Sequence, residues 1–438
     1  MTDQPKPFPT PFAPAPRRDF LKTSVALTAA SALPGFAIAQ QKTLRIGYIT
    51  ALSGPRAPFG VADEWHLARM RALLKDGIEV AGGKRLPVEI IMKDNQSEAN
   101  RSMQVAQDLV LRDKVDLMLV QDGDASTIAG QLCDVHGIPM VSTMSPWQAF
   151  LFARNGKVSK GFPFSFHFFW GADDLVKQFV AMWDSVTTNK QVGTLYVDNP
   201  AGQAFADPLR GMPAMIRSGG YRESTGGFFK LSADDFSNQV STFKNSGTQI
   251  ISGFVYESHF ATFWKQAQQS GLRPEVVSVA AAFPFPSAVK ALGNAGNGMS
   301  TEVVWAPTFP FRSSLNGQSA RDLVTDWEKG TGQQWIQPLG YVHALWEVGL
   351  HALKTAADPF DRKAVRDAIQ NMTLDTIVGR VDFKNSPIKS VAKTALAGGQ
   401  WRRTANGAKH PYELVVVNNA LAPAIPLGGK LELLSQIK

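Results

Sequence analysis

The chain has 438 residues, 44% hydrophobic and 19% charged, which is the ordinary balance of a soluble globular protein and leaves room for two domains. Its formal net charge of +8 is spread along the chain with no basic run longer than two residues, which argues against a nucleic-acid-binding surface. The single cysteine, Cys133, excludes a disulfide framework.

The first 39 residues have the pattern of an export signal. Arg17-Arg18 is followed by Phe-Leu-Lys, by a mildly apolar run over 25–38, and by Ala-Ile-Ala at 37–39, a small-residue cleavage site. We predict a twin-arginine signal peptide over residues 1–39 and a mature protein in the periplasm. The alternative is a membrane anchor, which is less favoured because the run is shorter than roughly 20 apolar residues and contains Pro34 and Gly35.

The first part of the mature chain alternates between strands and helices. Short apolar runs predict buried strands over 44–50, 88–92, 115–120 and 138–141, with a helix in each interval. Such alternation predicts a parallel sheet that is covered by helices on both faces.

The third of these helices begins after Asp122-Gly123-Asp124, a turn composition at the end of a strand. We expect Asp124 or Ser126 to cap this helix, and Gly137 to end it. Ile128, Leu132 and Val135 follow one another at spacings of four and three, which predicts that they form its buried face.

Hydroxyl side chains concentrate in two loops that leave the carboxyl ends of adjacent predicted strands. They are Ser126, Thr127, Ser142, Thr143 and Ser145. In an open α/β sheet such loops border the crevice where ligands bind, so these residues are candidate donors to a small anionic or polar group. Each one singly is explained equally well as a cap or turn residue. If they bind ligand, replacing Ser126 and Thr143 by alanine weakens binding more than tenfold.

The alternation restarts after a Phe-rich bridge over 162–170. We predict strands over 192–197, 250–255 and 276–280 and near 228, with helices over 175–183 and 234–244 and one ending near 217. An extended stretch at 302–310 contains two prolines and crosses between domains. Helices are predicted over 320–328, 339–354 and 362–370, and a last strand over 413–417. The fold class is α/β with two domains.

With these loops in order, the chain resembles the substrate-binding proteins of ABC importers, of the type that binds branched-chain amino acids. The resemblance covers residues 43–420. It is carried by ITALSGP at 49–55, Ala-Ser-Thr at 125–127, GIPMVS at 137–142, Asp-Phe-Ser at 235–237, Lys-Gln-Ala at 265–267 and Gly-Leu at 271–272. Each motif is weak alone, and their order and spacing together are more specific.

The resemblance implies a type I periplasmic binding fold, in which two Rossmann-like three-layer domains are joined by a three-strand hinge and close over a ligand. It divides the chain into one lobe over 43–165 plus 305–378 and another over 166–304 plus 379–438. Carried over from the family, Ala125 or Ser126 and residues 142–145 hold a ligand carboxylate. Phe59 matches an aromatic lid, and Tyr256 a contact from the second lobe.

Two positions depart from the pattern of that family. Ala201 stands where relatives carry a tyrosine, and the loop at 280–282 is Ala-Ala-Ala where relatives carry the acid that holds the ligand ammonium. An uncompensated buried ammonium is costly, so a simple leucine-like ligand is disfavoured. Asp122, Asp198 or Glu257 are possible substitutes for that acid.

Aromatic residues concentrate instead in predicted loops and crossovers. They are Trp147, Trp170, Tyr256, Phe283, Phe285 and Trp305. Ordinary packing explains such residues singly. Together they suggest a bulky amino-acid-like or aromatic carboxylate, with its anion on the hydroxyl loops and its body stacked on Trp147 and Tyr256. Phe283 is a further candidate contact.

Other functional classes find less support in the sequence. There is no G-x-S-x-G elbow, no H-E-x-x-H pair and no cluster of Cys and His, so we expect neither an enzyme nor a cofactor or metal site. A periplasmic sensor that signals to a membrane receptor, and less plausibly an exported hydrolase, are the alternatives. The expected partners are a small organic ligand and the permease and ATPase subunits of the importer, with the protein itself a monomer.

Overall fold

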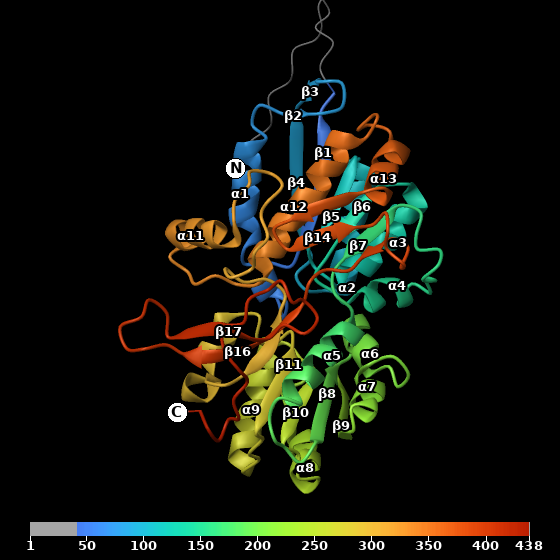
Figure 1. Ribbon diagram of the computed structural model, residues 1–438. Coiled ribbons are helices and arrows are strands. Elements are labelled where there is room, and N and C mark those ends of the chain that lie inside the picture. The colour runs from blue at the N-terminus through green and yellow to red at the C-terminus, as the bar shows by residue number, and fades with distance from the viewer. Residues whose placement is uncertain (1–41, 438) are drawn as a thin grey trace, which may run out of the picture. The chain divides into compact units, whose positions relative to one another are not determined.

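The computed structural model describes residues 42–437, so the expected signal peptide lies outside the described residues. This part of the chain forms two separate sheets, each covered by helices (Figure 1). The first sheet is parallel and the second is mixed. We call the first sheet with its helices the first lobe, and the second sheet with its helices the second lobe. The α/β class predicted from the alternating pattern is confirmed.

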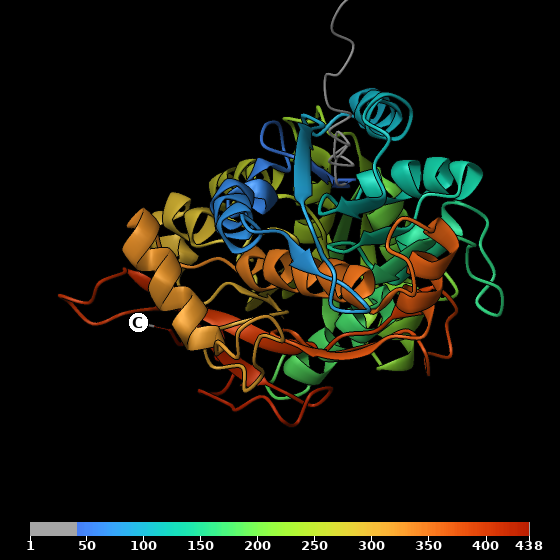
Figure 2. The same cartoon turned by 90° about the horizontal axis from the view of Figure 1, so that it is seen from above.

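The first sheet has six parallel strands in the order β15-β7-β6-β5-β1-β4. They are β1 (Leu44–Thr50), β4 (Val88–Asp94), β5 (Leu117–Val120), β6 (Met140–Ser142), β7 (Ser165–Phe168) and β15 (Val391–Ala392). Helices α1 (Asp63–Leu73) and α12 (Pro338–Thr355) pack together on one face, and α2 (Ala99–Gln107) and α3 (Ala125–His136) on the other (Figure 2). Buried strands covered on both faces are continuous apolar runs, which is how the sequence reveals them.

The second sheet has seven strands in the order β17-β16-β12-β11-β10-β8-β9. They are β8 (Gln191–Val197), β9 (Arg222–Phe229), β10 (Ile250–Phe254), β11 (Val276–Ala280), β12 (Ser300–Val303), β16 (Ala397–Arg403) and β17 (Tyr412–Asn418), the last two antiparallel to their neighbours. Its helices are α5 (Ala172–Trp183), α6 (Pro200–Ala206), α7 (Met212–Ser218), α8 (Ser237–Asn245), α9 (Glu257–Ser270) and α10 (Pro286–Ala291).

The remaining elements are connections. The first lobe also contains η1 (Ala57–Gly60), η2 (Asp108–Arg112), α4 (Trp147–Phe152), α11 (Ala320–Thr331), α13 (Arg362–Gln370) and the small pairs β2 (Ile78–Glu79) with β3 (Arg85–Leu86) and β13 (Thr373–Thr376) with β14 (Gly379–Asp382). The short helix η3 (Gly293–Gly296) precedes β12.

The chain passes between the sheets three times. The passages lie between β7 and α5, after β12, and between β15 and β16. The two lobes have other limits in the structure than those expected from the sequence. Both β7 at 165–168 and β15 at 391–392 pair within the first sheet, so they belong to the first lobe. The third passage therefore follows residue 392 rather than residue 378, since the short parallel pairing of β15 with β7 was not visible in the sequence.

Helix α3 begins and ends where the sequence predicts, with Gly137 in the left-handed conformation at its end. Its predicted buried face is wrong. Val135 is 76% exposed, whereas Ala129, Gly130 and Cys133 are buried. A methyl group at Gly130 would lie 2.5 Å from the Arg154 guanidinium, so this helix packs closely through its small residues. Of its larger apolar residues, Ile128 and Leu132 are partly buried and Val135 is exposed.

Helix α12 carries a buried carboxyl group that holds two loops in place. Glu347 accepts hydrogen bonds from the N–H and the hydroxyl of Ser314 and from the N–H of Ile377. Burial raises the pKa of Glu347 to about 7, although these donors lower it. The proton that Glu347 retains near neutral pH therefore contributes to the stability of the fold.

We expect the free energy of unfolding to fall as pH rises from about 5 to 7, because the folded chain then holds protons that the unfolded chain has lost. Glu347 contributes a slope of at most about 1.4 kcal/mol per pH unit in this window. Urea denaturation at several pH values should show a shallower slope for Glu347→Gln than for the wild type. An unchanged slope contradicts this assignment.

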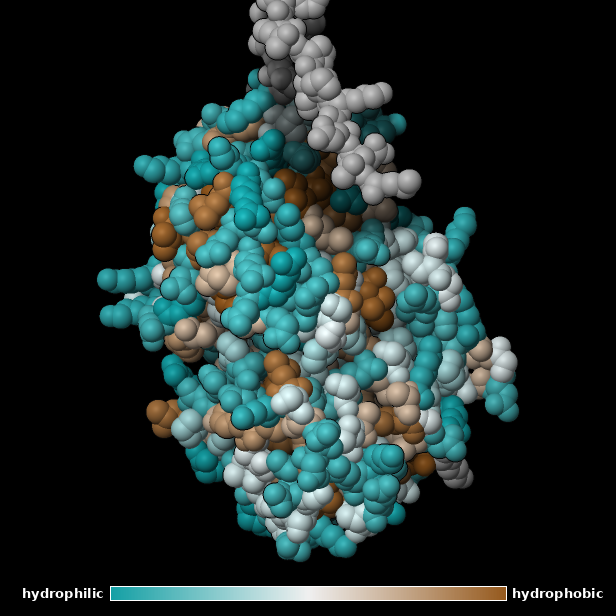
Figure 3. Space-filling view, turned by 180° about the vertical axis from the view of Figure 1, so that it is seen from behind, coloured by the Kyte–Doolittle hydropathy of each residue, from teal (hydrophilic) through white to brown (hydrophobic). Residues whose placement is uncertain are grey.

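No helix among residues 42–437 is long and apolar enough to cross a membrane. The face of the molecule in Figure 3 is mostly hydrophilic, with hydrophobic residues in scattered groups.

Candidate functional site

Loops at the carboxyl ends of both sheets meet at a narrow cavity between the lobes. It is lined from the first lobe by Arg56, Phe59, Asp122, Gly123, Asp124, Met144 and Ser145, and from the second by Ala201, Phe254 and Tyr256. The cavity has a volume of about 20 Å³, little more than one water molecule requires. The lobes are therefore closed on each other, and side chains of the protein fill the cleft.

A buried arginine and two aspartates lie at the centre of this cleft. The Arg56 guanidinium donates two hydrogen bonds to Asp122, at 2.8 and 2.9 Å, and its third nitrogen lies 3.1 Å from the Asp124 carboxylate. Arg56 is only 5% exposed. Burial alone would lower the pKa of Arg56, but Asp122 and Asp124 raise it above its ordinary value, so the guanidinium stays charged.

Asp124 connects the two lobes directly. Its carboxylate accepts hydrogen bonds from the Asn199 amide, at 3.0 and 3.2 Å, and from the Tyr256 hydroxyl, at 3.4 Å. The same amide donates to the Tyr256 hydroxyl at 2.8 Å. Burial raises the pKa of Asp124, although Arg56 lowers it. The expectation that Asp124 or Ser126 caps α3 is wrong for both side chains, because neither accepts a capping hydrogen bond there.

Aromatic side chains close the cleft beside this polar cluster. The Phe59 ring lies edge-on to Phe285, with centroids 4.8 Å apart, and to Tyr256 at 6.3 Å. Phe59 belongs to the first lobe, and both of its partners to the second. Phe59 and Tyr256 were expected to be a lid and a second-lobe contact, and the structure brings them together.

Of the five candidate hydroxyl residues, only Ser145 lines the cavity. The others donate to backbone carbonyls within the first lobe: Ser126 to Gly123, Thr127 to Asp124, Ser142 to Phe166 and Thr143 to Phe168. Ser126 and Thr127 thus donate within their own turn. Ser142 and Thr143 donate to the neighbouring strand β7, so all four hydroxyls stabilise the first lobe itself.

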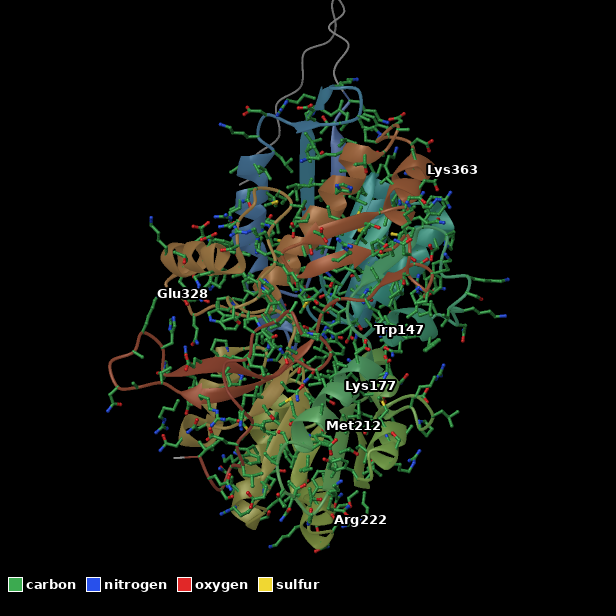
Figure 4. The ribbon with its side chains drawn as sticks, in the orientation of Figure 1. Trp147, Lys177, Met212, Arg222, Glu328 and Lys363 are labelled. Carbon is green, nitrogen blue, oxygen red and sulfur yellow. The ribbon has the colours of Figure 1, made fainter. Side chains whose placement is uncertain are left out.

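Three further candidates also lie away from the cavity. Ala125 is fully buried in the first turn of α3. Trp147 packs against Phe152 at 5.5 Å, at the edge of the first lobe that faces the second (Figure 4). Phe283 packs against Phe260 at 4.8 Å. The two large rings are therefore used in packing, which was the alternative explanation for each of them.

Sequence reasoning missed Arg56, Met144, Asn199 and Phe254, and explained Asp124 as a turn or capping residue. One signal was available for the polar cluster. An Asp-Gly-Asp segment at the carboxyl end of a buried strand places two carboxylates at the crevice, and these require a cation nearby. Arg56, in the loop after the first strand, was the nearest candidate cation along the predicted sheet edge.

The triple alanine at 280–282 has an acid beside it. Glu302, on the neighbouring strand β12, accepts hydrogen bonds from the N–H of Ala281, at 3.0 Å, and from the hydroxyl of Thr301, at 2.6 Å. Burial raises the pKa of Glu302 to about 7. Its carboxyl group is enclosed within the second lobe and does not line the cavity. Within residues 42–437, no group of three or more His, Cys, Asp or Glu is arranged to hold a metal ion.

The fold matches solved structures of binding proteins. The leucine-binding protein LivK of Thermotoga maritima superposes with a TM-score of 0.67 at 18% identity, over 86% of this chain and 99% of its own. The substrate-binding protein LivJ of Streptococcus pneumoniae, in complex with isoleucine, gives 0.66 at 18% identity, over 86% and 100%. An ABC-transporter solute-binding protein of R. palustris, in complex with benzoate, gives 0.68 at 14% identity, over 89% and 98%.

The family model described as "Periplasmic binding protein" matches residues 43–417, which is most of the chain. Two lobes that meet at the carboxyl ends of their sheets, three passages between them and a closed interlobe cavity agree with this match. The chain therefore belongs to the family of periplasmic binding proteins.

Proposed function

We propose that this protein is the solute-binding component of an ABC importer. It is exported by the twin-arginine pathway, works in the periplasm as a monomer, and encloses a small amino-acid-like or aromatic carboxylate between its lobes. The loaded protein then delivers the solute to a membrane permease with its ATPase subunits. The observation that carries this proposal is the cavity at the carboxyl ends of both sheets, where residues of both lobes meet.

The chemistry of the cavity suits a solute with a polar head and an apolar body. Arg56 and Ser145 offer hydrogen-bond donors, whereas Phe59, Met144 and Phe254 offer apolar surface. Ala201 contributes only a methyl group to the lining of the cavity. A solute that contacts both lobes stabilises the closed arrangement, because those contacts exist only when the lobes are shut.

The solute can be identified by native mass spectrometry of freshly purified protein, which weighs any small molecule that is retained. Benzoate, 4-hydroxybenzoate, phenylalanine and leucine are then tested by calorimetry. Micromolar or tighter binding of one of them at one site per chain supports the proposal. If neither experiment finds a bound solute, the proposal fails.

The Phe59→Ala protein is expected to bind that solute at least tenfold more weakly, because Phe59 closes the cavity against Phe285 and Tyr256. Phe228→Ala is the matched control, since Phe228 is a half-exposed ring on β9, away from the cavity. Equal affinities for the wild type and Phe59→Ala contradict a lid role for Phe59.

A further inference from the structure

In the closed cleft, one carboxylate of the protein occupies a position that donors from both lobes surround. The Asp124 carboxylate lies 3.1 Å from Arg56 of the first lobe, and it accepts from Asn199 and Tyr256 of the second. Asp122, by contrast, is paired with Arg56 and Asn95, both within the first lobe. Asp124 is thus the acid of this cluster that links the lobes.

Two of the three donors around Asp124 are held in place independently of it. The Asn199 side-chain oxygen accepts from the N–H of Gly202 at 2.8 Å, which turns its NH₂ group toward the cleft. Two hydrogen bonds to Asp122 fix the plane of the Arg56 guanidinium and leave its third nitrogen directed at Asp124. This arrangement is a preformed receptor for a carboxylate.

Asp124 itself has no other structural use for its carboxylate. It precedes α3 at the position where an acid commonly caps a helix, yet it makes no capping hydrogen bond. Its side chain is 16% exposed, whereas that of Asp122 is 3% exposed. The apolar part of the cavity, formed by Phe59, Met144 and Phe254, begins beside it.

We propose that Arg56, Asn199 and Tyr256 form the seat for the carboxylate of the solute, and that Asp124 occupies this seat and latches the lobes shut when no solute is bound. This inference rests on the proposed function for the identity of the occupant. An incoming organic carboxylate takes the three donors, and Asp124 moves aside. Asp124 is therefore a built-in competitor, and it sets how strongly a solute must bind in order to open the latch.

The latch can be tested without any solute. Cysteines introduced at Arg71 on α1 and Ser241 on α8, both exposed, allow spin labels to report the distance between the lobes, while the native Cys133 is buried and remains unlabelled. Without solute, the wild-type background is expected to give a narrow distribution, and Asp124→Ala a broader one centred at a longer distance. Asp198→Ala, an exposed acid next to Asn199, is the matched control and should behave as the wild type.

The seat is tested with benzoate and with benzamide, a neutral molecule of the same shape. Asp124→Ala is expected to bind benzoate at least tenfold more tightly than the wild type and to return to the short distance when benzoate is added, whereas the affinity for benzamide changes less than threefold. Asp124→Asn keeps the side-chain volume and removes the charge, so it shows whether the charge is responsible for the change in benzoate affinity.

Two results would overturn the inference. If Asp124→Ala has the same distance distribution as the wild type, there is no latch, whether or not any solute binds. If Asp124→Ala opens and benzoate affinity does not rise, the seat is not a carboxylate site. The proposed function fails separately, when no solute is found for the wild-type protein by mass spectrometry or calorimetry.

Discussion

Replacing Arg56 by alanine is expected to lower the free energy of unfolding by about 3–5 kcal/mol, the range measured when one partner of a buried ion pair is removed. Arg56 is 5% exposed, and it is the cation paired with both Asp122 and Asp124. Without it, two carboxylates remain in a buried cleft and must be desolvated without compensation. Urea denaturation monitored by circular dichroism measures this loss.

The same exchange at an exposed ion pair provides the control. Arg45 pairs with Glu89 at the surface, where their side chains are 44% and 51% exposed, so Arg45→Ala should cost no more than about 1 kcal/mol. Adding Asp122→Asn to Arg56→Ala should restore part of the lost stability, because it removes one of the uncompensated charges. A loss below about 1 kcal/mol for Arg56→Ala would contradict a buried charge cluster.

Gly202→Ala is expected to reduce solute affinity at least a hundredfold and to destabilise the fold by about 3 kcal/mol, the upper part of the range for overpacked sites. A methyl group at Gly202 would lie 1.8 Å from the backbone oxygen of Val197, and a backbone atom cannot rotate away as a side chain can. The loop must shift, and Asn199, which is held by the N–H of Gly202, shifts with it. Calorimetry and urea denaturation measure the two effects.

Gly429→Ala is the matched control for this exchange. A methyl group there meets only the end of the Val415 side chain, at 3.3 Å, and Gly429 is exposed. Its stability should stay within about 0.5 kcal/mol of the wild type. If Gly202→Ala binds solute as the wild type does, the loop that carries Asn199 is not part of the binding site.

The alternation of apolar strands and amphipathic helices was enough to predict two α/β domains and the parallel first sheet. Strand β1 over 44–50, β11 over 276–280 and helix α13 over 362–370 have the predicted limits. Several strands were not predicted, among them β7, β15 and β16. β7 lies in the Phe-rich bridge, and β16 has the glycine-rich sequence AGGQWRR. Both are strands because a neighbouring strand pairs with them, and local composition does not report such pairing.

The buried face of α3 shows a limit of periodicity. Ile128, Leu132 and Val135 do follow a helical spacing, but Val135 is 76% exposed and so does not belong to a buried face. The helix instead packs through Ala129, Gly130 and Cys133, because small residues allow a close approach to the rest of the lobe. How closely a helix packs depends on the elements around it, and the sequence of the helix alone does not describe those elements.

The loops of the cleft could be located from the sequence, since they follow the carboxyl ends of predicted parallel strands. The groups within them that face the cleft could not all be identified. Ser126 and Thr143 use their hydroxyls on nearby carbonyls, whereas Asp124 directs its carboxylate across to Asn199 and Tyr256. The carbonyl that Ser126 uses is 3 residues away and the one that Thr143 uses is 25 residues away, both within the first lobe. The partners of Asp124 lie 75 and 132 residues away, in the second lobe.

The order of apolar runs, turns and glycines was sufficient for the α/β class, the two sheets and the loops that border the cleft, because backbone pattern depends on nearby residues. The interlobe cluster of Arg56, Asp124, Asn199 and Tyr256 became visible only in three dimensions. Charge compensation in a buried cleft depends on distances between segments far apart in the chain. Those distances are set by how the two lobes close, and no local pattern encodes them.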